Sequence, residues 1–256
     1  MRRYSYFIAD MHLGAGYIAD PKAHERRIAD WLRSIASTAK ELYILGDALD
    51  YWYEYRYVVP QGYVRFFGAL ADLADSGVKI IWLKGNHDTW IFDYLPRELG
   101  IEVVDGVLDT NIDGHRFVME HGDGCGETRK SYRLIHRVFR NGLAQRLFSA
   151  IHPRWTVGFA HRWSAHSRKN GCTPTPAMFD TENDHLVLWA NRYAAEHPGV
   201  EYFVFGHRHI AISTSLACGA QLFIIGDGFR EMTYGLWDGE TFSIRKMEEA
   251  LDDNKF

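Results

Sequence analysis

Hydrophobic and polar positions alternate along the first hundred residues in a way that predicts strands and helices in turn. Apolar runs of strand length lie at 4–9, 41–45 and 78–83. Helical spacing of apolar residues separates them, at 23–37 and through 66–73. This β-α-β-α-β order is typical of a largely parallel sheet, which binds ligands beyond the carboxyl ends of its strands. We therefore expect polar, chemically active side chains to follow these strands.

After residue 100 the apolar runs become shorter, which predicts a second sheet. Strand-length runs at 101–104, 107–112 and 116–120 are separated by Asp-Gly turn dipeptides. Residues 179–196 have the spacing of a helix. Further strand-like runs lie at 202–205, 221–225, 233–237 and 241–246. The predicted fold class is α/β, and only the tail at 248–256 is expected to be irregular.

The segment 127–169 interrupts the strand pattern and is predicted to be a helical insertion. Its apolar residues recur at roughly helical spacing, and Pro153 is expected to interrupt the helix. It contains ten Lys and Arg residues but one acidic residue, Glu127. An ordinary amphipathic helix pair that covers the core has the same pattern. The predicted division of the chain is a core of 1–126 and 170–256 with the insertion between them.

Composition narrows the class of protein. The chain has 256 residues, 46% of them hydrophobic, which is enough for one large core. A net charge of −4 argues against a dedicated nucleic-acid binder, because such proteins carry a broad basic excess. Three separated cysteines suggest neither a disulfide framework nor a thiolate zinc site. The apolar start is too short for a signal peptide, and no run reaches the ~18 residues of a membrane span, so we expect a cytosolic protein.

Five short polar motifs each follow a predicted strand. They are Asp10-x-His12, Gly46-Asp47-x-x-Asp50, Gly85-Asn86-His87-Asp88, His121-Gly122-Asp123 and Gly206-His207-x-His209. A lone His or Asp is ordinarily a surface, packing or capping residue, but five such motifs at successive strand ends converge on one edge. Imidazole nitrogen combined with carboxylate and amide oxygen suits manganese, iron or zinc. The motifs therefore predict a site for transition-metal ions.

The ordered motifs, which span residues 10–209, resemble the calcineurin-like metallophosphoesterase superfamily. The resemblance implies two mixed β-sheets packed face to face and flanked by helices, with two divalent metal ions. One ion would be held by Asp10, His12 and His209, the other by Asn86, His121 and His207, and Asp47 would bridge both. A hydroxide shared by two ions ~3.5–4 Å apart would attack phosphorus in line with the leaving group.

The same resemblance assigns roles to four further motif residues. His87 matches a histidine that is not a ligand and that stabilises the transition state or protonates the leaving group. Asp88 would orient His87. Asp50 and Asp123 would hold metal ligands in position.

Within the superfamily, the chain resembles the UDP-2,3-diacylglucosamine hydrolase family. The segments that carry the resemblance are 7–13, 42–47 and the basic insertion. It implies cleavage of a lipid-linked UDP-sugar to UMP and 2,3-diacylglucosamine 1-phosphate in lipid A biosynthesis, usually with Mn²⁺, although Fe or Zn remain open. It also implies an insertion that forms a lid over the acyl chains, and a cytoplasmic protein bound peripherally to the inner membrane of a Gram-negative bacterium.

The basic residues and apolar faces of the insertion suit this role, because they can meet phosphates, acyl chains and an anionic membrane surface. The candidate substrate contacts are Asn86, Tyr132, Arg133, Arg168 and Lys169. The aromatic run at 51–57 either borders the site or packs against the insertion, and packing is the expectation.

Three departures from the hydrolase family keep other functions open. His87 stands where better-known members carry Arg, Asp227-Gly228-Phe229 stands in place of Gly-Asp-Trp, and an acidic residue is missing near Arg129. The first alternative is a phosphoesterase for another nucleotide, phosphodiester or lipid-linked diphosphate. The second is a non-catalytic scaffold similar to the retromer subunit with this fold, which the complete ligand set disfavours. A nucleic-acid substrate is not expected, because the basic residues cluster on the apolar-faced insertion.

Overall fold

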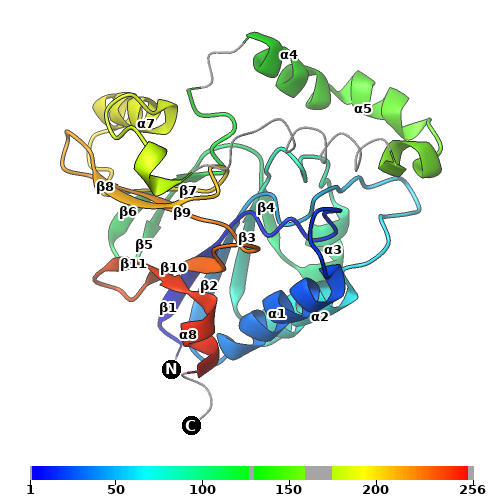
Figure 1. Cartoon of the computed structure of the whole chain (residues 1–256), viewed down its shortest axis with the longest axis horizontal. Helices are drawn as coiled ribbons and strands as arrows, with labels where there is room; N and C mark the ends of the chain where they lie inside the picture. Colours follow the sequence, from blue (N-terminus) through cyan, green and yellow to red (C-terminus); the bar gives the residue numbers. More distant parts are fainter. Residues whose placement is uncertain (1, 127–129, 159–174, 253–256) are drawn as a thin grey trace.

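Two β-sheets packed face to face form the centre of the computed structural model, which describes residues 2–126, 130–158 and 175–252 (Figure 1). The first sheet has the order β11 (Phe242–Lys246), β10 (Thr233–Trp237), β1 (Tyr4–Ile8), β2 (Ala39–Leu45), β3 (Lys79–Leu83) and β4 (Glu102–Val104). Strands β1, β2 and β3 are parallel, as the alternation of the first hundred residues predicts. Strand β4, which the sequence pattern assigns to a second sheet, instead pairs parallel with β3, and β10 and β11 extend the sheet antiparallel.

The second sheet has the order β5 (Leu108–Ile112), β6 (His115–Glu120), β7 (Tyr202–Phe205), β9 (Gln221–Ile225) and β8 (Ala211–Ser215). Its three central strands β6, β7 and β9 are parallel, and the two edge strands are antiparallel. The sequence pattern does not predict β8. None of its residues is fully buried, so this edge strand lacks the apolar run by which the other strands are recognised.

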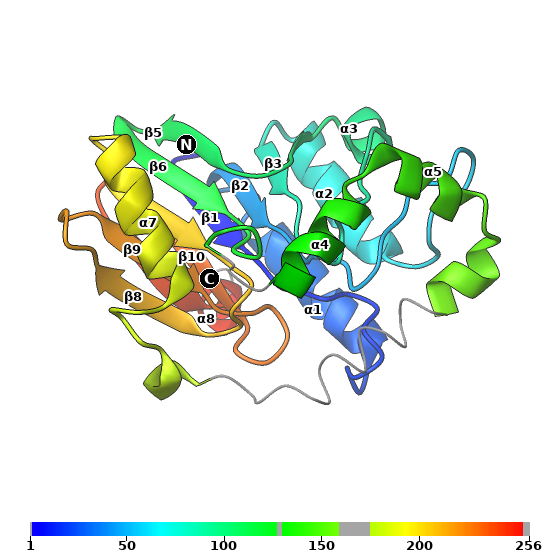
Figure 2. The ribbon, with the colours of Figure 1, turned by 90° about the horizontal axis from the view of Figure 1, so that it is seen from above.

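Helices cover the outer faces of both sheets. Helices α1 (Pro21–Ser34), α2 (Val64–Asp75) and α3 (Tyr94–Leu99) pack on the first sheet, and α7 (His185–Glu196) packs on the second. Figure 2 shows α7 on one side of the paired sheets and α2 and α3 on the other. The predicted sandwich of two mixed sheets with flanking helices is confirmed.

Three apolar layers follow from the alternation of side chains along the strands. On β1, Phe7 faces the second sheet, whereas Tyr6 and Ile8 face the helices of the first. Because both faces of this strand are covered, all of its residues except Ser5 are apolar or aromatic. On β7, Phe203 and Phe205 form a third layer with α7.

The start of helix α7 and the C-terminal tail also differ from the sequence-based prediction. Helix α7 begins at His185 and not near 179, because the Asp184 side chain caps it and the Asp180 carboxylate accepts N–H bonds that form a turn before it. The tail expected to be irregular contains helix α8 (Met247–Asp252).

The described part of the segment predicted to be an insertion is helical. It contains α4 (Lys130–Phe139), α5 (Gly142–Ser149) and helical residues 153–158, and it lies apart from the two sheets at one end of the molecule (Figure 1). The side chains of Tyr132 and Arg133 on α4, and the whole of Arg168 and Lys169, lie outside the described residues.

An aromatic cluster attaches the insertion to the core. Tyr53 and Trp90 from the core pack against Phe139 and Phe148 of the insertion. The Trp90 indole donates to the Phe139 carbonyl at 2.8 Å, and the Tyr53 hydroxyl donates to the Gln145 carbonyl at 2.7 Å. The expectation that aromatic residues in 51–57 pack against the insertion is confirmed. Within the described ranges, no helix is both long and apolar enough to cross a membrane.

Candidate metal centre

The five polar motifs meet at the carboxyl ends of parallel strands from both sheets. Asp10 and Asp47 follow β1 and β2, and their loops are joined by the hydrogen bond from Asp10 N to Gly46 O at 3.1 Å. His121 and His207 follow β6 and β7, whose loops are joined by the bond from Gly206 N to His121 O at 2.9 Å. The Asp10 carboxylate then links the sheets, because Oδ2 accepts the His207 N–H at 2.7 Å.

Five of the seven predicted ligands have a left-handed backbone. Their φ angles are 51° at Asp10, 45° at His12, 51° at Asp47, 65° at His207 and 53° at His209. Such a conformation costs a residue other than glycine about 1–3 kcal/mol and persists only where surrounding contacts enforce it. This concentration of backbone strain at one site points to function.

Two motif glycines allow the loops to approach each other closely. A Cβ atom at Gly85 would overlap the backbone and carboxylate of Asp47, and one at Gly206 would lie 2.8 Å from Asp10 Oδ2. The absent side chains therefore let the carboxylates reach the centre of the site.

The ligands of the first predicted ion converge in the structure. Asp10, His12 and His209 each offer an atom within 4.8 Å of the others. Asp10 Oδ1 lies 3.4 Å from His209 Nε2 and 3.7 Å from His12 Nε2. Asp47 is adjacent, because its Oδ2 lies 3.8 Å from His12 Nε2.

The ligands of the second predicted ion converge on the other side of Asp47. In a second group, Asp47, His121 and His207 each offer a ligand atom, and these atoms lie within 4.8 Å of one another. His121 Nε2 lies 3.3 Å from Asp47 Oδ2 and 3.3 Å from Asn86 Oδ1. The structure thus brings all seven predicted ligands together, with Asp47 between the two groups.

These spacings fit bound cations. Two ligands that each lie about 2.0–2.1 Å from one ion are separated by roughly 3 Å or slightly more, depending on the angle at the metal. Asp10 Oδ1 is buried and takes part in no hydrogen bond, as expected of an oxygen kept for a cation. His121 Nδ1 bonds to the Leu45 carbonyl at 2.8 Å, which assigns the proton to Nδ1 and leaves the Nε2 lone pair for a metal.

The electrostatics of the group also favour cations. Burial alone would raise the pKa of Asp47, but His121, His87 and His12 outweigh it and hold the pKa well below its usual value. Burial, with neighbouring His121, lowers the pKa of His207 to about 3, so its imidazole is neutral and able to coordinate. Burial raises the pKa of Asp10, which shows that an anion there is costly without a compensating positive charge.

His87 lies beside both ligand groups. It forms a third group with His12 and Asp47, and its ring is 4.8 Å from that of His12. Its Nδ1 donates to the Asp50 carbonyl at 2.9 Å, and Asp50 Oδ1 lies 3.6 Å from the same nitrogen. This leaves Nε2 available for proton transfer, and the partly exposed ring can meet a bound substrate.

The sequence-based prediction for Asp88 is that it orients His87. The Asp88 carboxylate is fully buried and accepts hydrogen bonds from Gly85 N, Ala48 N and Trp82 Nε1. It therefore fixes the Gly85 turn, and burial raises its pKa to about 6. Asp50 makes the contact with His87.

Asp50 and Asp123 lie where they can support ligands. Asp50 Oδ1 is 3.4 Å from His12 Nδ1, on the opposite side of that ring from Asp10 and Asp47. Asp123 is buried near His121. Burial alone would lower the pKa of His121, but Asp47 and, less strongly, Asp10 and Asp123 raise it well above its usual value.

The sequence reasoning missed two residues that support ligands. His24 on α1 is buried, and its Nε2 bonds to the Met11 carbonyl at 2.8 Å, between Asp10 and His12. The fully buried Asp227 places Oδ2 3.9 Å from His209 Nδ1. Asp227 belongs to the Asp-Gly-Phe segment noted in the sequence, which was the available signal. Nothing in the sequence marks His24.

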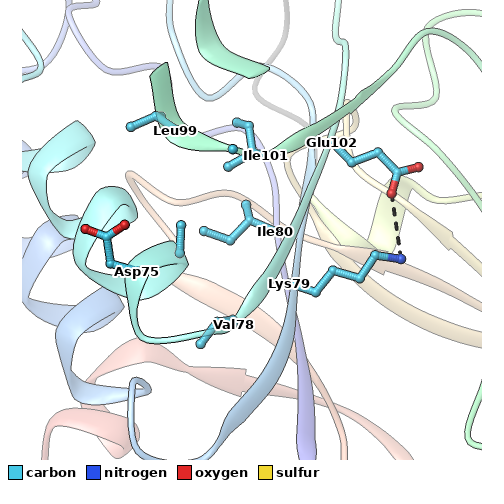
Figure 3. A pocket seen from close by; sticks show the side chains of 9 residues that line it. Asp75, Val78, Lys79, Ile80, Leu99, Ile101 and Glu102 are labelled. Carbon is cyan, nitrogen blue, oxygen red and sulfur yellow. Dashed lines mark ion pairs between the residues drawn. The ribbon is translucent and has the colours of Figure 1, made fainter. Parts of the chain in front are cut away.

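A pocket of about 380 Å³ lies away from this centre. It is lined by the end of α2, by Gly100 and by residues at the beginnings of β3 and β4, including Lys79 and Glu102 (Figure 3). The ligands follow the opposite ends of the strands, so the pocket is separate from the metal centre.

Comparison with known proteins identifies the family. The family model described as calcineurin-like phosphoesterase matches residues 5–211. The chain belongs to the calcineurin-like phosphoesterase family. It is thus a metallophosphoesterase, a hydrolase, and the paired Asp and His groups form the dimetal type of site that is typical of the family.

Several relatives match over almost the whole chain. The UDP-2,3-diacylglucosamine hydrolase of Porphyromonas gingivalis is 42% identical over 97% of this chain and 99% of its own length. The enzyme of the same name from Serratia proteamaculans is 27% identical over 96% of each chain. Among solved structures, a dimetal phosphatase from Danio rerio aligns over 96% of this chain and 99% of its own, with 14% identity and a TM-score of 0.45.

Proposed function

We infer that this calcineurin-like phosphoesterase hydrolyses the pyrophosphate of UDP-2,3-diacylglucosamine to UMP and 2,3-diacylglucosamine 1-phosphate, a step of lipid A biosynthesis. The observation that carries this inference is the full-length similarity to the P. gingivalis enzyme of that name. The arrangement of the candidate metal centre is compatible with it, because all seven ligand positions required for two ions are occupied by suitable side chains.

In this proposal Asp10, His12 and His209 hold one divalent ion, Asn86, His121 and His207 hold the other, and Asp47 is shared. The proposed metal is Mn²⁺, because imidazole mixed with oxygen ligands suits it, and Fe and Zn are the other candidates. Two bound ions would polarise the phosphate and supply a nucleophilic oxygen at neutral pH.

His87 is proposed to act on the leaving group. The bond to the Asp50 carbonyl fixes the ring, and Nε2 then faces away from that contact. In its protonated form Nε2 would donate a proton to the departing sugar phosphate. Asp50 also lies near His12, so it would hold the acid and one metal ligand in register.

The insertion is proposed to cover the acyl chains. Leu134, Leu143, Leu147 and Trp155 are between 61% and 69% exposed, which leaves apolar surface on the described helices unpartnered. Asn86 at the centre and Tyr132, Arg133, Arg168 and Lys169 of the insertion are the proposed substrate contacts.

The same surface supports a proposal of peripheral binding to the cytoplasmic face of the inner membrane of a Gram-negative bacterium. Arg137, Arg146 and Arg154 are exposed close in sequence to the apolar residues. Mixed basic and apolar residues favour an anionic bilayer surface, and the proposed substrate is a membrane lipid. Cosedimentation with vesicles should therefore require anionic lipid and weaken with salt.

The direct test is release of UMP from UDP-2,3-diacylglucosamine by the Mn²⁺-loaded protein. We expect turnover that is lost on chelation and restored by Mn²⁺. Asp47→Ala should be inactive, because it removes the ligand shared by both ions, whereas Asp72→Ala on the exposed side of α2 should be active. Absence of turnover with every divalent metal would contradict the proposal.

The alternative is that the enzyme acts on another substrate. His87 favours this alternative, because better-known members of the hydrolase family carry Arg at that position. The same preparation should therefore be assayed with a nucleotide, a simple phosphodiester and another lipid-linked diphosphate. Turnover of one of these without turnover of the UDP-sugar would assign the enzyme to that substrate class.

A further inference from the structure

Two aromatic side chains outside the five motifs border the metal centre. Tyr17 and Phe229 pack edge to face, with ring centroids 5.6 Å apart and planes inclined by 63°. The Phe229 ring is 5.8 Å from that of His12 and 5.5 Å from that of His209. Tyr17 lies 6.5 Å from His12. The pair thus lies next to the ligand group that contains Asp10.

Tyr17 is held near His12 by a short turn. Ala15 N donates to the His12 carbonyl at 3.1 Å, and Ile18 N donates to the Ala15 carbonyl at 3.2 Å. The Tyr17 side chain is nevertheless 37% exposed, so part of the ring can be reached from solvent.

Phe229 is fixed more firmly. The buried carboxylate of Asp227 accepts the N–H groups of Phe229, at 3.3 Å, and of Arg230, at 2.7 Å. The Arg230 guanidinium lies 5.4 Å from the centre of the Phe229 ring and donates to the His209 carbonyl at 3.2 Å. The loop is therefore tied to a metal ligand, and the ring is preorganised.

We propose that Tyr17 and Phe229 form a subsite for the nucleobase of a nucleotide whose phosphate occupies the metal centre. The inference rests on the proposed function, because that substrate contains a nucleotide. A base is separated from its phosphate by one ribose, so it must lie close to the metal ligands. A partly exposed aromatic ring at that position offers a surface on which a planar base stacks.

The positions of the other aromatic residues favour this orientation of the substrate. His12 has His87 on one side and Phe229 on another, with ring centroids at 4.8 Å and 5.8 Å. His87 belongs to the loop that continues to Trp90, which contacts the insertion. The lipid end would then point toward the insertion, and the nucleobase would point toward Tyr17 and Phe229.

The experiment compares UMP with ribose 5-phosphate, which lacks the base, by calorimetric titration of the Mn²⁺-loaded protein. We expect UMP to bind at least about fivefold more tightly, since stacking of one base on an aromatic side chain typically contributes that factor or more. Tyr17→Ala and Phe229→Ala should leave the affinity for ribose 5-phosphate unchanged. In these variants the ratio of the affinity for UMP to the affinity for ribose 5-phosphate should fall to about one. Tyr17→Phe, which keeps the ring, should preserve the ratio.

The matched control is Tyr57→Ala, which removes an 83% exposed tyrosine outside the proposed subsite and should preserve the ratio. Equal binding of the two ligands by the wild-type protein would overturn the proposal, as would a ratio that survives both alanine variants. Turnover of the UDP-sugar with equal binding of both ligands would overturn the subsite alone. A base-dependent ratio without turnover of the UDP-sugar would support the subsite and contradict the proposed substrate.

Discussion

At the scale of single residues, hydrogen bonds from histidine Nδ1 to backbone carbonyls determine which ring nitrogen remains free to bind a metal or transfer a proton. His121 commits Nδ1 to the Leu45 carbonyl and His87 commits Nδ1 to the Asp50 carbonyl, so each ring has Nε2 left for chemistry. The sequence motifs predict which residues meet, but they do not contain these partners. The motifs therefore do not predict that Asp50 contacts His87, or that Asp88 binds the Gly85 turn.

Asp88→Ala is expected to affect stability more than proton transfer. It leaves Gly85 N, Ala48 N and Trp82 Nε1 without their buried acceptor, and each loss costs about 1–3 kcal/mol. Urea denaturation of the metal-free protein should show a fall of about 3 kcal/mol or more in the free energy of unfolding. The exposed control Asp72→Ala should change it by less than ~0.5 kcal/mol. If Asp88→Ala were fully stable but inactive, the result would support a role of Asp88 in orienting His87.

His87→Ala is expected to slow cleavage in a way that depends on the leaving group. Loss of a general acid typically costs 10²–10⁴-fold in rate when the leaving group needs a proton. The fall in kcat should therefore be about 100-fold or more for a phosphodiester with an alkyl alcohol as leaving group, and much smaller for a p-nitrophenyl ester, whose leaving group departs without a proton. An equal loss on both substrates would instead indicate that His87 acts on the phosphate or the metals.

At the scale of secondary structure, burial explains which elements can be predicted. Strands β1, β2 and β3 are recognisable because most of their residues are buried and apolar. Strand β8 lies at an edge with half-exposed residues, and the start of α7 depends on the Asp184 cap, so neither appears in the hydrophobic pattern. The insertion is predicted as helical from its spacing, but its attachment through Trp90 and Tyr53 depends on long-range packing.

Trp90→Ala is expected to loosen the insertion from the core. The change removes ring contacts with Phe139 and Phe148 and the indole hydrogen bond, and buried Trp→Ala changes cost about 3–5 kcal/mol. Limited proteolysis should cut within 130–158 at least about ten times faster than in the wild type. Tyr57→Ala, an aromatic deletion at an exposed position, should not alter the rate. Unchanged cleavage in Trp90→Ala would mean that the aromatic cluster does not hold the insertion.

At the scale of the whole molecule, topology gathers residues that are up to about two hundred positions apart. Asp10 and His209 meet because β1 belongs to one sheet, β7 to the other, and the carboxyl ends of both face the same site. The family motifs make this convergence predictable. His24 lies on a helix and Asp227 on a loop near the C-terminus, and both lie outside the five motifs. Their contacts with the ligand loops form only when the chain folds, so the sequence does not reveal them.

Metal removal should destabilise the whole molecule. Ions that bind only the folded state stabilise it by roughly 3 kcal/mol at a concentration 100 times their Kd, and each kcal/mol corresponds to about 2–4 °C in Tm for a chain of this size. We therefore expect chelation to lower the Tm of the Mn²⁺-loaded protein by about 5–10 °C. Asp47→Ala should show almost no response to the chelator. Equal responses in both proteins would argue that Asp47 does not bind the ions.

The measurement that tests the central claim most directly is the number of metal ions bound per chain, determined by elemental analysis after Mn²⁺ loading and removal of free metal. Two ions held by seven ligands predict close to two per wild-type chain, and a marked loss of both in Asp47→Ala, because that carboxylate lies between the two ligand groups. A wild-type protein that retains no metal, or an Asp47→Ala variant that retains both ions, would contradict the dimetal centre.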